Sequence, residues 1–286
     1  MTLEAAVLNG IAASLGRPIV RAVPVSGGCI SPSFRTHLEG GAVVFVKTAP
    51  EGAGPDLLAQ EAVSLDRLGE AGAVRVPRVL GRGDGWLALE WLEPRVGTSA
   101  DWALLGRRLA GLHGVKAEAP GWPADNYIGP LPQRNASAGS WADFWARRRL
   151  APQLELAGGR VAGRMRALFD RIMDEVDDRL AGAEADGYSL LHGDLWNGNV
   201  HMTSEGPALV DPSSWFGHRE VDLAMADLFG GFPREFRGAY DAEWPPLPGA
   251  AARRPVYQLY YLLVHLNLFG DAYLAGTERA LRAALA

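Results

Sequence analysis

The chain has 286 residues, which is long for one compact domain and sufficient for two lobes that share a cleft. Apolar residues make up 48% and charged residues 21%, as in ordinary soluble globular proteins. The formal net charge is -5 with acids and bases mixed along the chain, which argues against a basic stripe for nucleic acid. The single cysteine, Cys29, excludes an intrachain disulfide and favours a reducing compartment.

The chain offers no segment that resembles a membrane span or a signal peptide. No run approaches the ~20 apolar residues needed to cross a bilayer. The segment 1–15 carries the acidic Glu4 and no long apolar core, unlike a secretory signal. We therefore expect a cytoplasmic protein with neither a membrane nor a nucleic acid as partner.

The chain up to Glu93 predicts a twisted antiparallel sheet with one helix packed against it. Runs rich in β-branched and aromatic residues predict the strands, and apolar residues at helical spacing predict the helix. Adjacent glycines allow backbone angles that other residues avoid, so they predict a turn. The predicted elements are a short helix at 2–15, strands at 19–25, 33–38, 42–47, 78–80 and 86–91, a turn at 26–29 and the packed helix at 56–68.

After Glu93 the pattern becomes mainly helical. Abundant Pro, Gly and Asn predict mostly loop over 120–140. We expect two lobes, 1–93 and 94–286, with the boundary near Glu93. The predicted elements of the second lobe are helices at 101–113, 141–150, 161–180 and within 253–285, and short strands at 188–191 and 208–210.

The most informative stretch is Leu-His-Gly-Asp-Leu-Trp-Asn-Gly-Asn at 191–199. Asp194 and Asn199 have the spacing of kinase catalytic loops, in which the Asp accepts the proton of the attacking hydroxyl and the Asn binds a metal ion. Asp211 follows a short apolar run farther along the chain. Mg²⁺ prefers one or two carboxylates together with phosphate oxygens and water. The three positions predict phosphoryl transfer from Mg·ATP, with Asp194 as catalytic base and Asn199 and Asp211 as metal ligands.

The first lobe contains the parts that would bind ATP. Lys47 ends a predicted strand and Glu61 lies in the following helix, as do a kinase's phosphate-binding lysine and the glutamate that orients it. The glycine-containing turn would cover the phosphates, although it is neither a Walker A nor a full G-x-G-x-x-G sequence. The remaining predicted ATP-binding residues are Gly27, Gly28 and Cys29 of this turn, and Glu90, Trp91 and Leu92, where the last strand of the sheet meets the second lobe.

The positions of several other residues near these motifs suggest what each side chain does. Trp196 follows the predicted base and is a candidate platform for a sugar, with a core position as the alternative. His192 is expected to brace backbone, and Asp222 to hydrogen-bond to the catalytic loop from below. Arg219 and Glu220 are expected to form a structural ion pair.

One predicted helix near the C-terminus carries a repeating polar and aromatic pattern. Tyr257, Tyr261 and His265 recur at helical spacing, which usually indicates packing. His265 is also a candidate for contact with the substrate. The segment 125–127 (Asp-Asn-Tyr) is either a loop beside the substrate or a connection between helices.

With these residues placed, the sequence resembles the fructosamine-3-kinase (ketosamine kinase) family, which is similar to aminoglycoside phosphotransferases and choline kinases and more distantly to protein kinases. The combination of HGDLW-x-x-N with the later DP-x-x-x-x-G-x-RE-x-DLAM carries most of the resemblance. The matching stretches are GGCIS at 27–31, WPADNYIG at 122–129, HGDLWNGNV at 192–200, DPSSWFGHREVDLAM at 211–225, LFGGFP at 228–233 and YQLYYLLVHLNLFG at 257–270.

The resemblance implies an α+β, protein-kinase-like fold, with a small antiparallel-sheet lobe that binds ATP and a larger helical lobe that binds substrate. It implies ATP- and Mg²⁺-dependent phosphorylation of the 3-hydroxyl of ketosamines, either small molecules of the fructosamine or ribulosamine type or glycated proteins. The product is unstable and releases the amine, which suggests deglycation repair. By position, Asp194 is the base, Asn199 and Asp211 bind metal, and Lys47 and Glu61 form the ATP pair.

Two positions refine this picture. After Asp211-Pro212 the family usually has Ala, whereas this chain has Ser213, and the aromatic pair before Gly217 begins with Trp215. Trp215 is therefore a further candidate for substrate contact. A cysteine at the position of Cys29 is linked in the family to redox sensitivity, so we expect a monomer or weak homodimer with a possible redox-linked dimer through Cys29.

Two alternatives stay open. The first is a kinase for another small alcohol, such as an aminoglycoside or choline. Aminoglycosides are polycations and favour a strongly acidic site, whereas the cleft segments here carry aromatic residues and scattered acids. The second is a non-catalytic, nucleotide-binding regulatory module, against which the complete set of predicted catalytic residues argues.

Overall fold

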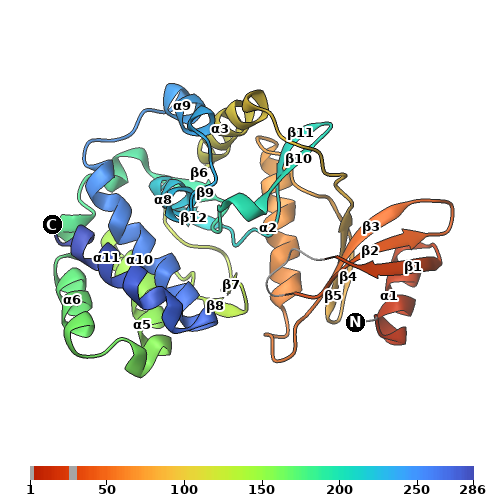
Figure 1. Ribbon diagram of the computed structural model, residues 1–286, viewed down its shortest axis with the longest axis horizontal. Coiled ribbons are helices and arrows are strands. Elements are labelled where there is room, and N and C mark those ends of the chain that lie inside the picture. Colours follow the sequence, from red (N-terminus) through yellow and green to blue (C-terminus); the bar gives the residue numbers. More distant parts are fainter. Residues whose placement is uncertain (1–2, 26–30) are drawn as a thin grey trace.

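The computed structural model of the chain describes residues 3–25 and 31–286. Figure 1 shows a sheet with two helices at one end of the molecule and a mainly helical lobe at the other. The elements of the first lobe are α1 (Ala5–Leu15), β1 (Ile19–Pro24), β2 (Ser33–Leu38), β3 (Val43–Thr48), α2 (Leu57–Ala71), β4 (Val79–Gly83) and β5 (Trp86–Glu90).

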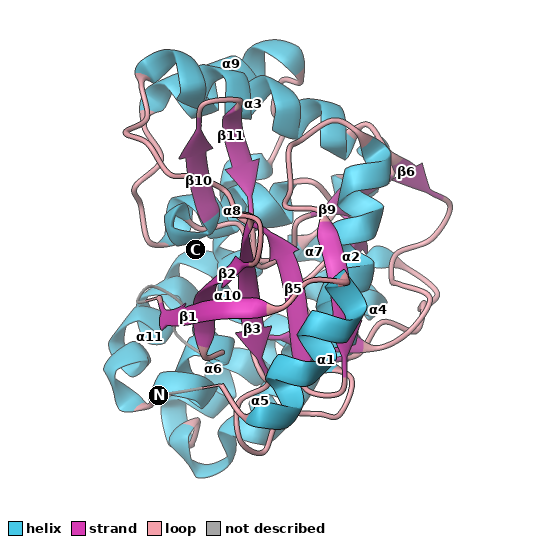
Figure 2. Ribbon diagram, turned by 90° about the vertical axis from the view of Figure 1, so that its right-hand side faces the viewer, coloured by secondary structure: helices cyan, strands magenta, loops and turns pink. Residues whose placement is uncertain are grey.

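The sheet of the first lobe has the strand order β1-β2-β3-β5-β4, and all neighbouring strands are antiparallel. Side chains alternate between the two faces of a strand, and β5 shows the result. Trp86 and Ala88 pack with Ile11 of α1, whereas Leu87 and Leu89 pack with α2. Figure 2 shows α1 in front of the sheet, on the face away from the helical lobe. Helix α2 therefore lies between the sheet and the second lobe.

The second lobe contains the long helix α10 (Ala250–Phe269), which packs against several of the other helices of this lobe. No helix within residues 3–25 and 31–286 has both the length and the apolar run of a membrane span. The longer helices are α3 (Ser99–His113), α5 (Ala151–Ala157), α6 (Gly163–Asp174), α8 (Glu220–Leu228), α9 (Arg234–Glu243), α10 (Ala250–Phe269) and α11 (Leu274–Ala284). The short ones are α4 (Trp141–Phe144), the π-helix η1 (Trp145–Leu150), η2 (Gly158–Arg160), α7 (Val176–Arg179), η3 (Ala183–Asp186), η4 (Asn197–Asn199) and η5 (Asp271–Tyr273).

Small sheets complete the second lobe and carry its loops. The strand order β12-β9-β6 forms one of them, and the pairs β10-β11 and β7-β8 form antiparallel hairpins. Their strands are β6 (Lys116–Ala117), β7 (Asn126–Ile128), β8 (Leu131–Gln133), β9 (Tyr188–Leu191), β10 (Val200–Thr203), β11 (Gly206–Leu209) and β12 (Trp215–Gly217).

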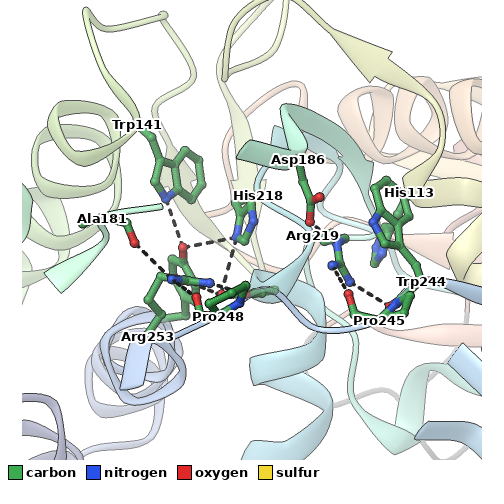
Figure 3. A network of polar contacts seen from close by, with 12 residues as sticks. His113, Trp141, Ala181, Asp186, His218, Arg219, Trp244, Pro245, Pro248 and Arg253 are labelled. Carbon is green, nitrogen blue, oxygen red and sulfur yellow. Dashed lines mark hydrogen bonds and ion pairs between the residues drawn. The ribbon is translucent and has the colours of Figure 1, made fainter. Parts of the chain in front are cut away.

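Two buried arginines fix the connection between α9 and α10 (Figure 3). Arg219 pairs with Asp186 at 2.6 Å and donates to the carbonyl oxygens of Trp244 and Pro245. Arg253 pairs with Glu220 at 2.7 Å and donates to the carbonyl oxygens of Ala181 and Pro248. The predicted ion pair between Arg219 and Glu220 is therefore wrong, because each side chain finds a partner that is distant in sequence.

The structure confirms the strands predicted before Glu93, with small shifts at their ends, and the predicted helix 56–68 continues to Ala71. The predicted turn at 26–29 lies outside the described residues. The predicted boundary near Glu93 falls in the segment between β5 and α3 and stays a prediction.

The second lobe differs more from expectation. The predicted helix 161–180 is interrupted at Glu175, and the predicted helix 141–150 changes into the π-helix η1. The predicted loop 120–140 contains the hairpin β7-β8, and the sequence reading missed α8 and α9.

We predict that acid destabilises the fold in part through His218. Burial, followed by the charges of Arg253 and Arg219, lowers the pKa of His218 to about 2 from its ordinary 6.5. The unfolded chain therefore binds the extra proton below pH 6.5 and the folded chain does not, so stability falls as pH drops below that value. The contribution is up to about 1.4 kcal/mol per pH unit for one histidine.

Urea unfolding at about pH 7.5 and about pH 5.5 measures this effect. The variant His218→Asn keeps an acceptor for the Tyr257 hydroxyl, which lies 3.3 Å from Nδ1 of His218, but it does not titrate. The variant is expected to lose about 1 kcal/mol less free energy of unfolding than the wild type between the two conditions. Equal losses would show that His218 is not responsible.

Candidate active site

Two adjoining cavities, lined by described residues, lie between the lobes. The larger has a volume of about 390 Å³ and the smaller about 120 Å³. They share a wall made of Lys47, Trp196, Asn199 and Asp211. Apolar side chains dominate the larger cavity, whereas the smaller cavity has many hydroxyl, amide and carboxylate groups.

The wall contains a buried ammonium group between two carboxylates. Nζ of Lys47, on β3, lies 2.7 Å from Oε1 of Glu61 on α2 and 2.8 Å from Oδ1 of Asp211. Burial alone lowers the pKa of Lys47, but the charges of Asp211 and Glu61 outweigh burial and raise it. Burial likewise opposes ionisation of Asp211, yet Lys47 lowers the pKa of that carboxyl. Lys47 is therefore charged and joins the sheet, α2 and the second lobe.

Asp211 has a strained backbone. Its φ of 54° makes it the one non-glycine residue with positive φ in 3–25 and 31–286. Left-handed backbone is uncommon for residues with a side chain and concentrates at functional sites. Asp211 follows the β10-β11 hairpin, and its carboxylate contacts Lys47.

The catalytic loop follows β9 and is held mainly through its backbone. The carboxylate of Asp222 accepts from the N–H groups of His192 at 2.8 Å and Gly193 at 2.9 Å, and the Tyr261 hydroxyl donates to the Gly193 carbonyl at 2.9 Å. Gly193 has a φ of 84°, and a Cβ there would lie 2.0 Å from the Ser213 carbonyl oxygen, so only glycine fits. The predicted support by Asp222 is confirmed.

His192 fixes the loop from its other side. Its Nε2 lies 2.9 Å from the Val210 carbonyl oxygen, and its Nδ1 accepts from the N–H of Asp194 at 3.3 Å. The predicted bracing role of His192 is confirmed. The loop then places Asn199, whose Nδ2 donates to Oδ2 of Asp194 at 3.2 Å and to the Asp194 carbonyl oxygen at 2.9 Å.

The side chain of Asp194 faces the smaller cavity. Burial and the nearby charge of Asp211 raise the pKa of Asp194 to about 7, although the Asn199 amide opposes the shift. A carboxyl with a pKa in this range can accept a proton near neutral pH. A cation bound at Asp211 would weaken the repulsion and lower the pKa of Asp194.

The larger cavity contains Lys47 and the predicted nucleotide residues at the end of β5, whereas Glu61 lines only the smaller cavity. Glu90, Trp91 and Leu92 line the larger one, together with Phe45 and Leu89 of the sheet. The Glu90 carboxylate pairs with Arg75 at 2.8 Å and with Arg78 at 3.3 Å, so salt bridges hold the end of β5. The predicted residues Gly27, Gly28 and Cys29 lie outside the described residues.

Of the three predicted substrate residues, only Trp196 lines the cavities. It borders both, and its ring packs against Gly198, where a Cβ would lie 2.2 Å from the ring. Trp215 is fully buried, with the Arg149 guanidinium 3.9 Å from its ring, so its predicted substrate contact is wrong. His265 also lines neither cavity, and its Nδ1 lies 2.8 Å from the Tyr261 carbonyl oxygen.

The smaller cavity has a wall that crosses between the lobes. The Tyr127 hydroxyl, on β7, donates to Oδ1 of Asp56 at the start of α2, at 2.5 Å. Gly54 makes room for this ring, because a Cβ there would lie 2.1 Å from the hydroxyl oxygen. Asn126 also lines this cavity. The segment 125–127 therefore lies beside the cleft rather than being only a connection.

The sequence reading missed Gln60 and Ser64 of α2, which also line the smaller cavity. Both lie near Glu61 on the helix, and Ser64 is buried. In the sequence, the polar Ser64 lies three positions after Glu61, and this spacing is the signal that would have identified this face.

The comparisons with known proteins agree with this geometry. The fructosamine kinase family model matches residues 4–286. A probable ketoamine kinase of Thermus thermophilus is 41% identical over 266 residues, covering 92% of this chain and 93% of that protein. A ketosamine-3-kinase of Mus musculus is 32% identical over 300 residues, covering 94% and 96%.

A solved structure gives the same result. The crystal structure of a candidate fructosamine-3-kinase from Thermobifida fusca superposes with a TM-score of 0.89, at 36% identity over 98% of each chain. The two-lobe fold, the sequence identity and the match over nearly the whole length lead to one assignment: the chain belongs to the fructosamine kinase family and has its protein-kinase-like α+β fold.

Proposed function

We propose that this protein is an ATP-dependent kinase that phosphorylates the 3-hydroxyl of ketosamines. The observation that carries the proposal is the arrangement of Lys47, Asn199 and Asp211 on the wall between two cavities, with Asp194 beside them in the smaller cavity. One cavity has the apolar character suited to a nucleotide base and the other has the polar character suited to a sugar.

ATP would lie in the larger cavity. The apolar side chains of Phe45, Leu89 and Trp91 suit adenine, and the chain after β5 offers backbone hydrogen-bonding groups. Lys47 lies at the inner end of this cavity, where its ammonium group would contact phosphate oxygens while Glu61 holds its orientation.

Mg²⁺ would bind at Asn199 and Asp211. Asn199 uses its Nδ2 to bond Asp194, which leaves its amide oxygen available, and Asp211 uses only Oδ1 to bond Lys47. One carboxylate oxygen and one amide oxygen are hard ligands, and phosphate oxygens and water would complete the set. The residues therefore fit Mg²⁺, which would neutralise charge on the phosphates.

The acceptor would occupy the smaller cavity with its 3-hydroxyl at Asp194. The hydroxyl oxygen forms a bond to the γ-phosphorus, the bond from that phosphorus to the bridging oxygen breaks, and ADP leaves. Asp194 takes the proton of the hydroxyl. The phosphorylated ketosamine then loses its amine, so the reaction would serve deglycation repair on either small ketosamines or glycated proteins.

Three expectations from the sequence concern the location and assembly of the protein rather than its site. We keep a cytoplasmic location as a proposal, which the use of a single cysteine supports. A monomer or weak homodimer also stays a prediction. The redox-linked dimer through Cys29 concerns a residue outside the described part of the chain and stays a prediction as well.

The first testable prediction of the proposed function concerns the reaction. Mg²⁺-dependent ATP turnover is expected with ribulose-lysine or fructose-lysine, and Asp194→Ala is expected to lose at least ~10³-fold of kcat. A coupled ADP assay with an aminoglycoside and choline as further acceptors measures this. Turnover with only the aminoglycoside or choline would show that the protein is a kinase but would exclude ketosamines as its substrates. ATP binding without any turnover would favour a regulatory module.

The second prediction concerns the sugar platform. Trp196→Ala is expected to raise the KM for the ketosamine about 10-fold, because the sugar loses an aromatic face to stack on. Trp91→Ala is the matched control, since Trp91 lines only the nucleotide cavity of the two, and it is expected to raise the KM for ATP instead. An unchanged acceptor KM in Trp196→Ala would reject the platform.

The third prediction concerns the ion pair. Glu61→Gln keeps the shape of the side chain but removes the charge that orients Lys47, so the KM for ATP is expected to rise at least ~10-fold. Glu70→Gln removes an exposed pair with Arg67 on the same helix and serves as control, because surface pairs contribute little. If ATP binds equally well to Glu61→Gln, the pair has no such role.

A further inference from the structure

A line of buried polar side chains lies behind the catalytic loop, and the proposed reaction does not use it. It runs from Asp222 through His113 and Tyr240 to Arg219. All four side chains are fully or almost fully buried, and none lines either cavity. Polar groups buried this deeply cost free energy unless they are paired, so their arrangement calls for an explanation.

The contacts along this line are continuous. Oδ2 of Asp222 lies 3.2 Å from Nε2 of His113, and Nδ1 of His113 lies 2.8 Å from the Tyr240 hydroxyl. Arg219 donates to the same hydroxyl at 3.4 Å. Figure 3 shows the far end, where Arg219 is held between Asp186 and Pro245 beside His113 and Trp244.

The direction of each hydrogen bond follows from the chemistry of the groups. An ionised Asp222 only accepts, so Nε2 of His113 carries the hydrogen and donates to it. In the neutral ring Nδ1 must then accept, and the Tyr240 hydroxyl donates to it. The hydroxyl oxygen accepts from Arg219, because a guanidinium group can only donate hydrogen bonds. Each group therefore has one consistent role, and the imidazole has a single tautomer.

Close packing of two helices creates this arrangement. His113 ends α3, and Tyr240 belongs to α9, which lies against α3 in Figure 1. Gly106 of α3 permits the approach, because a Cβ there would lie 2.2 Å from the Phe236 carbonyl oxygen of α9. The rings of His113 and Tyr240 meet edge to face, with centroids 5.6 Å apart.

We propose that His113 and Tyr240 are positioning residues for the catalytic base. His113 fixes the rotation of the Asp222 carboxylate, and this carboxylate holds the backbone N–H groups of His192 and Gly193, directly before Asp194. The line thus sets the position of the base from behind, without touching the substrate. This inference rests on the proposed kinase function and adds residues that act through Asp222.

The test compares His113→Leu with His113→Gln. Leucine removes the donor to Asp222, whereas the glutamine amide supplies an N–H near the position of Nε2. We expect His113→Leu to lower kcat about 10-fold or more, with the KM for ATP within about 2-fold, and His113→Gln to keep at least about one third of kcat. The assay uses whichever acceptor the wild type phosphorylates fastest.

A second readout does not depend on activity. Amide hydrogen exchange over 188–199 is expected to be faster in His113→Leu than in the wild type, and close to wild type in His113→Gln. If the wild type phosphorylates no ketosamine, the proposed function fails, while this exchange measurement still decides whether His113 holds the loop.

A pair of tyrosine variants provides a matched control and covers the case that His113→Leu does not fold. Tyr240→Phe removes the hydroxyl between His113 and Arg219. Tyr257→Phe removes an equally buried hydroxyl, which bonds to Trp141 and His218 rather than to this line. We expect Tyr240→Phe to lower kcat about 3-fold or more and to speed exchange of the loop, and Tyr257→Phe to change neither.

Two results would overturn the proposal. One is wild-type kcat and loop exchange in both His113→Leu and Tyr240→Phe. The other is an equal loss in His113→Leu and His113→Gln together with equal effects of the two tyrosine variants, which would mean that packing alone matters.

Discussion

The ammonium group of Lys47 is the constraint on which the two-lobe arrangement depends. A buried ammonium without partners costs several kcal/mol, so the fold must bring carboxylates to it. One comes from α2 of the same lobe and the other from the loop after β11 in the second lobe. The charge is therefore satisfied only when sheet, helix and second lobe meet. The same contact places the residues proposed for phosphate, metal and proton transfer around one wall.

Helix α2 is linked to the second lobe at two places. One is Glu61 in its middle, through Lys47 and Asp211, and the other is the beginning of the helix. Asp56, the residue directly before α2, accepts the hydrogen bond from Tyr127, and Gly54 leaves space for that ring. The hairpin that carries Tyr127 is itself anchored by buried amides, since Asn126 accepts from both Gln133 and Asn135. The polar cavity thus has a wall built from both lobes, whereas the catalytic loop is held by the second lobe alone.

Local sequence patterns were sufficient where contacts are local. The alternation of β5 and the apolar stripe of α2 predicted their elements, and the motif around Asp194 predicted its neighbours. The pair of Lys47 and Glu61 followed from a spacing that a strand and the next helix enforce. The fold class was predicted through the resemblance that these motifs carry.

Local sequence patterns could not predict contacts between distant parts of the chain. Asp211 lies 164 residues from Lys47, and no periodicity links them. Arg219 and Glu220 are neighbours with opposite charge, yet Arg219 pairs with Asp186 and Glu220 with Arg253. Trp215 follows the metal-site motif, but its position on β12 turns the ring into the core. The π-helix η1 and the hairpin β7-β8 likewise depend on packing that the local sequence does not encode.

Two separate requirements meet at Asp211, one from its left-handed backbone and one from the cation that it would bind. Conformation favours glycine, asparagine or aspartate there, because branched or bulky side chains are strained at such angles. Cation binding favours a carboxylate. A relative that abandoned catalysis could exchange this aspartate for asparagine or glycine if it also lost the buried ammonium of Lys47, which Asp211 pairs in this chain. The identity of this residue is therefore a marker that distinguishes relatives that retained the chemistry from those that retained only the architecture.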